Sequence, residues 1–202
     1  MRSGSRFAVG LWVLAILSAF TPPAAAQIDA RPASDGQMPM FVGPPLPPAT
    51  LLEGFRAPLG AVVTIGHETL GEVKGIAVGV RELRDSTGGH VRGAVVEVTP
   101  EKGAAQLSYI DIDELPLLLR GLDQLLGVTT NPTQFRNFEV HYATKGELEI
   151  TGSSSRSRGI VFSIEAGRQW KAWRDDLTPG ELQQVRVLVE AASQRLATMP
   201  DK

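Results

Sequence analysis

The amino-acid sequence predicts an α+β fold in which an antiparallel meander sheet carries two helices on one face, in the order βββ-α-ββββ-α. Short segments with an apolar residue at every second position, typical of half-buried strands, occur in two groups. A segment with apolar residues at helical spacing follows each group. Glycine-containing turns separate most neighbouring strands, which favours antiparallel hairpins over parallel crossovers.

Length and composition limit the kinds of protein that the chain can be. Its 202 residues, 43% hydrophobic and 21% charged, are enough for one packed domain and exclude a collagen-like or wholly disordered chain. The formal net charge of -2 offers no broad attraction to nucleic acid or anionic lipid, so we expect no nucleic-acid partner. The chain has no cysteine, which excludes disulfides, thiol nucleophiles and a lipoprotein anchor.

The first residues have the three-part layout of a secretory signal peptide. Arg2 and Arg6 precede the apolar segment 7–20, and the small residues 24–26 provide a cleavage site. An uncleaved membrane anchor is the alternative, but the apolar segment is shorter than the roughly 20 residues that a spanning helix needs. We therefore expect residues 1–26 to be removed, the mature chain to have no transmembrane segment, and the protein to be periplasmic or extracellular.

A proline-rich linker is predicted over residues 27–50. The segment holds six prolines, which lack a backbone N–H, and it has no repeating apolar face. We expect it to be disordered and extended, with a single α+β domain over residues 51–202. The start of that domain, 51–66, is ambiguous: its apolar residues suit a short helix that ends near Pro58, followed by a strand from Val62.

The first group of strands is placed by matching apolar faces, because a one-residue shift would turn a strand's apolar side chains to the wrong face. Residues 76–80 match 94–98 if the loop is 85–89, and these match 105–109 across the loop 100–103. The side chains expected to share the helix-covered face are Ile76, Val78, Val80, Ala94, Val96, Val98, Ala105, Leu107 and Tyr109.

A leucine-rich helix is predicted after these strands. Its leucines recur at helical spacing, so they line one face. Asp113 is the predicted cap, Pro116 lies in the first turn, where no N–H is needed, and Gly127 ends the helix. The leucines of this face are Leu115, Leu118, Leu119, Leu122, Leu125 and Leu126.

Four further strands are predicted to form a second meander. The turns between them are placed at 144–146, 153–157 and 166–168. In the first of these turns, Gly146 is free to take a positive φ. The side chains then expected on the helix-covered face are Phe138, Val140, Tyr142, Leu148, Ile150, Ile160, Phe162, Ile164, Trp170 and Ala172.

The last helix has a clear start signal. Thr178 and Glu181 match a capping box, Pro179 is at the first helical position, and Leu177 can pack against Leu182. The residues of its apolar stripe are Leu182, Val185, Val189, Ala192 and Leu196.

Few residues have the spacing of a catalytic or metal site. The three histidines match no zinc-binding spacing, and His67 beside Glu68 suits a solvated polar turn. Asp111, Asp113 and Glu114 suit a helix cap better than calcium, because the glycine of a calcium-binding loop is missing.

Hydroxyls and two arginines gather in the segment 152–158, which suits either a mobile hairpin loop or an anion grip. The segment lacks the spacing of a phosphate loop or of a nucleophilic serine. We assign no catalytic, metal-binding or cofactor-binding residue, and we expect no cofactor.

One candidate binding surface comes from the register of the second meander. Side chains that face away from the helices form rows across the sheet, with neighbours about 4.8 Å apart. The predicted rows are His141, Glu149, Val161 and Trp173, and then Ala143, Glu147, Ser163 and Lys171. A histidine beside a carboxylate and an exposed indole suits a small binding surface, and the alternative is an ordinary solvated face with one ion pair. The candidate residues are His141, Glu147, Glu149, Ser163, Lys171 and Trp173.

These patterns favour an exported, non-catalytic binding module of the bacterial cell envelope, with a protein or an envelope polymer as its partner. The first alternative is a carrier of a small apolar ligand, with a cavity between the sheet and the C-terminal helix. The second is a hydrolase-type enzyme that uses a carboxylate pair, or His141 with Glu149, as acid and base. The sequence does not decide the oligomeric state.

Overall fold

A computed structural model of the chain describes residues 49–129, 132–155 and 159–200. The predicted signal peptide, residues 1–26, and all but the last two residues of the predicted linker lie outside the described residues. The described part contains two four-stranded antiparallel sheets and three helices, which confirms the α+β class with antiparallel sheets.

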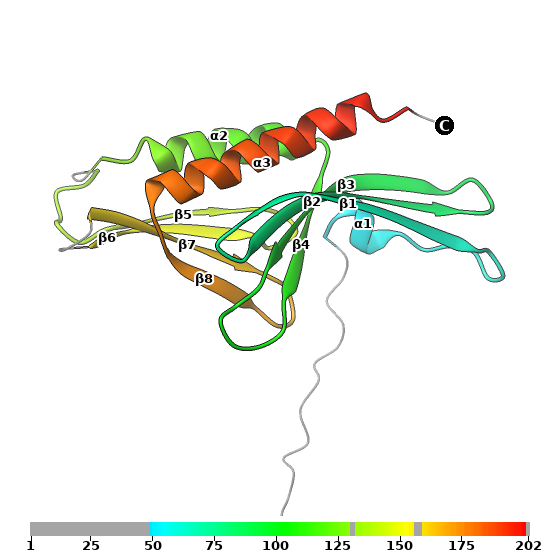
Figure 1. Cartoon of the computed structure of the whole chain (residues 1–202), viewed down its shortest axis with the longest axis horizontal. Helices are drawn as coiled ribbons and strands as arrows, with labels where there is room; N and C mark the ends of the chain where they lie inside the picture. The colour runs from blue at the N-terminus through cyan, green and yellow to red at the C-terminus, as the bar shows by residue number, and fades with distance from the viewer. Residues whose placement is uncertain (1–48, 130–131, 156–158, 201–202) are drawn as a thin grey trace, which may run out of the picture. The chain divides into compact units, whose positions relative to one another are not determined.

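Each half of the described chain contains a four-stranded meander followed by a helix (Figure 1). The strand order in each sheet follows the sequence, β1-β2-β3-β4 and β5-β6-β7-β8, and a short helix precedes the first meander. The elements are α1 (Leu51–Gly54), β1 (Val63–Val73), β2 (Ile76–Asp85), β3 (His90–Val98), β4 (Gln106–Asp111), α2 (Leu115–Leu126), β5 (Glu139–Ala143), β6 (Glu149–Ser155), β7 (Gly159–Ala166), β8 (Ala172–Leu177) and α3 (Pro179–Thr198).

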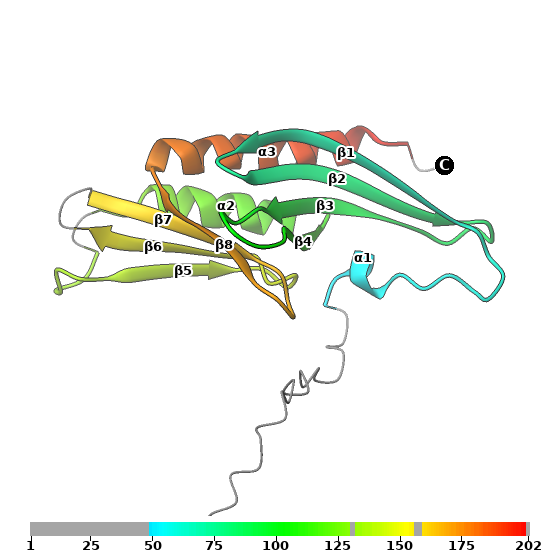
Figure 2. The same ribbon diagram turned by 60° about the horizontal axis from the view of Figure 1, so that its bottom comes forward.

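The two long helices lie side by side along the sheets (Figure 1, Figure 2). α3 packs on β1, β2 and β3 of the first sheet and also contacts β7 and β8 of the second. α2 packs against α3 and β5, whereas α1 contacts β3 and β4. The last helix therefore covers a sheet that the first half of the chain forms.

One apolar core joins the two sheets and the two long helices. The apolar stripe of α2, the predicted stripe of α3 and inward-facing side chains of both sheets belong to a single cluster of buried residues. Its largest fully buried side chains are Ile76, Ile110, Leu115, Leu118, Leu122, Ile150, Ile164, Leu177, Leu182 and Leu196.

A long strand occupies the part of the domain that the sequence left ambiguous. Thr50 begins α1 with a capping box to Glu53, and β1 then continues to Val73 with a bulge between Thr69 and Gly71. Side chains are exposed over most of β1, so no buried alternation marks it in the sequence. The first meander consequently has four strands rather than the predicted three.

The pairing of β3 with β4 corrects the predicted register by one residue. Val96 pairs with Ser108, because the turn between the strands is one residue longer than predicted. Ser108 and Ile110 therefore face the core, and Leu107 and Tyr109 face the opposite side. By contrast, the register of β2 and β3 agrees with the prediction, including the loop 85–89.

The second meander has the predicted strand order but different hairpin lengths. Tyr142 pairs with Ile150, Ile150 with Ile164, and Ile164 with Arg174. Each pairing is displaced from the prediction by an even number of residues, which leaves the same side chains on the same face of the sheet.

The helix ends agree with the sequence signals in most respects. Thr178 and Glu181 form the predicted capping box of α3, and Gly127 ends α2. The cap of α2 is Glu114 rather than Asp113, because a closed turn before the helix moves its start one residue along the chain. Within the described residues, none of the helices combines the length and the apolar character that crossing a membrane requires.

Candidate functional site

The outer face of the second sheet carries most of the predicted surface residues. One row across this face runs through Ala143, Glu149, Glu165 and Trp173, and the next through His141, Thr151 and Ser163. Because the hairpin lengths differ from the prediction, the neighbours within these rows differ from the predicted ones. None of these residues is moved to the core. In the following paragraphs this surface, formed by His141, Glu149, Thr151, Ser163, Glu165, Lys171 and Trp173, is called the outer-face cluster.

His141 lies beside Glu149, although the two residues are diagonal neighbours rather than direct partners. Its Nδ1 is 3.3 Å from Oε1 of Glu149 and 2.9 Å from the hydroxyl of Thr151, its direct partner across the strands. On the other side of the ring, Nε2 is 3.4 Å from Oε2 of Glu139. Carboxylates thus flank the imidazole on both sides.

Lys171 joins Glu149 to a further carboxylate, that of Glu165. Its ammonium lies 3.1 Å from Oε1 of Glu165 and 3.6 Å from Oε2 of Glu149. The hydrogen bond to Glu165, supported by the charge of Glu149, raises the pKa of Lys171. Glu149 therefore connects the histidine to a lysine that stays charged, in one network at the surface.

Two tryptophans are exposed near this network. Trp173 pairs with Glu165 on the outer face and is 60% exposed, and Trp170 is 59% exposed in the turn between β7 and β8. The prediction of Trp170 in the core is wrong, because that turn spans 167–171 and places the residue before the strand. Large aromatic side chains that the core does not use are common at binding surfaces.

Glu147 belongs to a different ionic group. It lies in the turn between β5 and β6 with a positive φ of 58°, and its Oε1 is 3.2 Å from Nε of Arg168. Arg168 also reaches Oε2 of Glu53 at 3.2 Å. The carboxylate of Glu147 thus takes part in a link between two turns of the second sheet and α1.

The acidic segment that begins at the last residue of β4 holds other elements in place. Oδ1 of Asp111 accepts a hydrogen bond of 2.9 Å from the N–H of Leu51 at the start of α1. Oε1 of the buried Glu114 accepts one of 2.8 Å from the N–H of Lys145. The described residues contain no cluster of side chains suited to a metal ion. The prediction of a carboxylate cap for the leucine-rich helix is wrong, because Glu114, at the cap position of α2, makes no side-chain capping hydrogen bond. Asp111 instead binds the N–H of Leu51 in α1, whose N-cap is Thr50.

We expect Asp111→Ala to release α1 from the first sheet. The N–H of Leu51 would lose its acceptor, and loss of a capping carboxylate costs about 1 to 2 kcal/mol. Hydrogen exchange measures the effect as lost protection of the Leu51 amide, and urea unfolding measures the change in stability. Asp113→Ala is the matched control, because its side chain is 76% exposed; equal effects of the two substitutions would contradict this role of Asp111.

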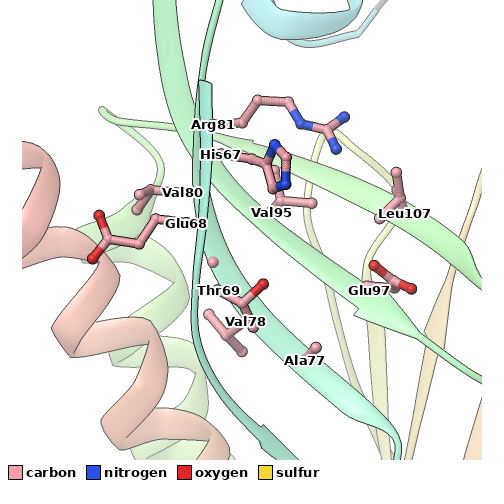
Figure 3. Close-up of a pocket in the computed structure, with 11 residues that line it drawn as sticks. His67, Glu68, Thr69, Ala77, Val78, Val80, Arg81, Val95, Glu97 and Leu107 are labelled. Atoms are coloured by element: carbon pink, nitrogen blue, oxygen red, sulfur yellow. The ribbon is translucent and has the colours of Figure 1, made fainter. Parts of the chain in front are cut away.

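A small hollow lies on the face of the first sheet opposite α3 (Figure 3). It has a volume of about 70 Å³ and forms where Ala77 and Gly79 leave space between His67, Arg81 and Glu97. This volume suits a few water molecules rather than an organic ligand.

His67 and Glu68 are in β1 and not in a polar turn, which corrects the sequence interpretation. The long strand continues through them, and their side chains point to opposite faces. His67 borders the hollow on one face, whereas Glu68 forms an ion pair of 2.9 Å with Arg195 of α3. His67 thus borders a hollow and Glu68 contacts α3, whereas the turn prediction gave both side chains only solvent as a neighbour.

An open groove of about 330 Å³ lies beside α3, where Gly71 and Val73 of β1 meet Val187 and Leu188. The groove is located at the edge of the helix. The carrier alternative instead predicts a cavity beneath the helix, between it and the sheet. The α3 stripe itself is buried to 2% exposure or less against the core. The groove therefore offers an apolar ligand a partly open surface site rather than an enclosed one.

Sequence reasoning missed Thr151 and Glu165 as members of the outer-face cluster. Their alternation with the core residues placed them on this face, but only the true hairpin lengths bring them next to His141 and Trp173. Arg156 and Arg158, the proposed anion grip, lie outside the described residues. No protein-family model matches the chain, and no curated protein matches it.

Proposed function

We propose that the protein is an exported, non-catalytic binding module of the bacterial cell envelope, and that it binds a protein or an envelope polymer through its outer-face cluster. The observation that carries the proposal is the exposed indole of Trp173 in the row that also contains Glu149, whose carboxylate contacts His141 and Lys171. The basic residues and apolar segment at the N-terminus support export.

The chemistry of the cluster suits a partner with both apolar and hydrogen-bonding groups. Trp173 offers a broad apolar plane, and Thr151 and Ser163 offer hydroxyls in the adjacent row of the same face. The two carboxylates near Lys171 accept hydrogen bonds, while the lysine supplies a charged donor. Such a surface holds its partner through aromatic contact and directs it through polar contacts.

The exposure of the cluster favours binding over catalysis. The side chains of His141 and Glu149 are 50% and 35% exposed, so solvent reaches the histidine–carboxylate pair considered for acid–base chemistry. Catalytic pairs gain most of their effect where water is excluded. The enzyme alternative therefore has the required neighbours without the required surroundings.

Substitution of Trp173 by alanine is expected to weaken partner binding at least tenfold, because exposed aromatic residues are frequent hot spots. The measurement is retention of the purified protein on immobilised peptidoglycan and, in parallel, on solubilised envelope proteins. Phe135→Ala is the matched control, since Phe135 is 76% exposed and lies outside the strands.

The retention measurement has two opposite outcomes. Retention that falls for Trp173→Ala and for Glu149→Gln, but not for Phe135→Ala, supports the outer-face cluster as the binding surface. Equal retention of all variants would exclude it. Native mass spectrometry tests the carrier alternative separately: an extra mass of a few hundred daltons, lost on denaturation, would favour an apolar ligand in the groove beside α3.

A further inference from the structure

The two edge strands of the first sheet, β1 and β4, differ in what lies against them. The outer side of β4 lies against turns of the second sheet: Gly146 approaches the backbone of Tyr109, and the N–H of Gly167 donates to the hydroxyl of Ser108 at 3.2 Å. β1, at the other edge, has no strand on its outer side among the described residues (Figure 2). The first sheet thus has one covered edge and one open edge.

The backbone of β1 presents an ordered row of hydrogen-bonding groups at this open edge. The carbonyl of Val62 accepts a hydrogen bond of 2.9 Å from the N–H of Ser86, so this pair is of the hydrogen-bonded type. Such pairs alternate along antiparallel strands, which directs the N–H and C=O groups of Val63, Ile65 and His67 outward. Another extended backbone can satisfy the whole row at once, in place of water.

The side chains of the edge do not oppose this kind of pairing. Residues 62–69 contain neither lysine nor proline, which commonly protect exposed edge strands. Val62 is 69% exposed and Ile65 is 58% exposed. Ile65 also begins an apolar row with Leu83 and Val91 on the face opposite α3, which a new strand at the edge would extend.

We infer that β1 pairs with β1 of a second copy of this chain, antiparallel and about a two-fold axis at Gly66. The bulge after Thr69 ends the regular part of the edge, so this axis makes full use of residues 63–69. Val63 then faces Thr69 of the other copy, and Ile65 faces His67.

The sequence of the edge is compatible with pairing to a second copy of itself. In this register Glu68, the only acidic residue of the segment, faces Thr64 of the other copy, so no like charges are directly opposed. Gly66 faces itself in a non-hydrogen-bonded pair, where the two backbones approach most closely. A glycine there avoids contact between identical side chains, and the strand is therefore complementary to itself.

This dimer goes beyond the proposed function, because it involves a different sheet. It joins two four-stranded sheets into one of eight strands and leaves both outer-face clusters available. A partner with repeated binding groups would then meet two surfaces at once, which increases its apparent affinity without any new contact.

Sedimentation velocity of the purified protein, measured without any ligand, tests the dimer independently of the proposed function. We expect a mass of two chains at tens of micromolar. Ile65→Lys places a charge in the new apolar row and is expected to raise the dimer dissociation constant at least tenfold. Leu117→Lys is the control, because Leu117 is a 51% exposed aliphatic residue on α2 and leaves the edge unchanged.

Single cysteines test the position of the axis, since the natural chain has none. The nearest atom to a Cβ at Gly66 is 4.0 Å away, so Gly66→Cys fits and should form a disulfide-linked dimer under mild oxidation. Thr64→Cys should not, because Thr64 faces residue 68 of the other copy. Crosslinking of both variants alike would exclude this register.

A mass of one chain at every concentration would overturn the dimer. If extended peptides then protected the amides of Val63 and Ile65 from exchange, the edge would belong to a peptide partner instead, which also overturns the inference.

Discussion

Replacement of Gly146 by alanine is expected to destabilise the protein by about 3 kcal/mol, an effect at the upper end of those caused by overpacking. A Cβ at this position would collide with the carbonyl oxygen of Tyr109 and would lie 3.1 Å from its backbone N. The obstacle is the backbone of β4, which cannot rotate away as a side chain can. The turn between β5 and β6 would have to withdraw, lengthening the hydrogen bond from Lys145 to Glu114.

Urea unfolding of Gly146→Ala measures this effect. Gly180→Ala is the matched control, because Gly180 lies in the first turn of α3 and the nearest atom to its Cβ would be 3.8 Å away. Alanine there should be neutral or stabilise by up to about 1 kcal/mol, through its better helix propensity. Equal stability of the two variants would show that the turn is not held against β4.

Leu122→Ala is expected to cost about 2 to 5 kcal/mol, the range for removing a large aliphatic side chain from a well-packed core. Leu122 is 0% exposed and belongs to the cluster that contains residues of both sheets and both long helices. A cavity at this point would weaken both meanders together. Leu117→Ala, on the same helix but 51% exposed, should change stability by less than about 0.5 kcal/mol.

The measurement for Leu122→Ala also tests whether the two sheets unfold as one unit. Circular dichroism reports on all the strands and helices, whereas tryptophan fluorescence reports mainly on Trp170 and Trp173 near β8. The shared core predicts that both signals change at the same urea concentration, in the variant and in the natural protein. Separate transitions would contradict a shared core.

The sequence predicted correctly where turn chemistry and apolar alternation agreed. The loop 85–89 fixed the register of β2 and β3, because any shift would have exposed the valines around Val78 and Val96. The capping box at Thr178 and Glu181 placed the start of α3. Local signals of this kind do not depend on what packs against the segment.

Alternation misled the prediction where tertiary contacts select a polar residue for the core. Leu107 and Tyr109 are the more apolar residues of β4, but Ser108 is buried because its hydroxyl accepts the N–H of Gly167 from a turn of the other sheet. The reason for the glycine at position 146 was also predicted wrongly. The sequence suggested a positive φ, which the neighbouring Glu147 adopts, whereas Gly146 is needed for the close approach to Tyr109.

The face of the candidate site was predictable, but its pairs of residues were not. The hairpins of the second sheet differ from the prediction by even numbers of residues, so His141 and Trp173 stay on the outer face. Which residues become neighbours depends on loop length, which the alternation does not encode. Glu147 was misplaced for this reason, and Thr151 was overlooked.

The position of α3 also affects the order in which the protein folds during synthesis. During synthesis from the N-terminus, β1, β2 and β3 emerge roughly a hundred residues before the helix that covers them. Until residues 179–198 arrive, the buried valines of these strands have no cover from α3, and closing so long a loop is slow. The first sheet to be synthesised is thus covered by the last helix. A chain interrupted before α3 would retain exposed apolar surface of the kind that chaperones bind.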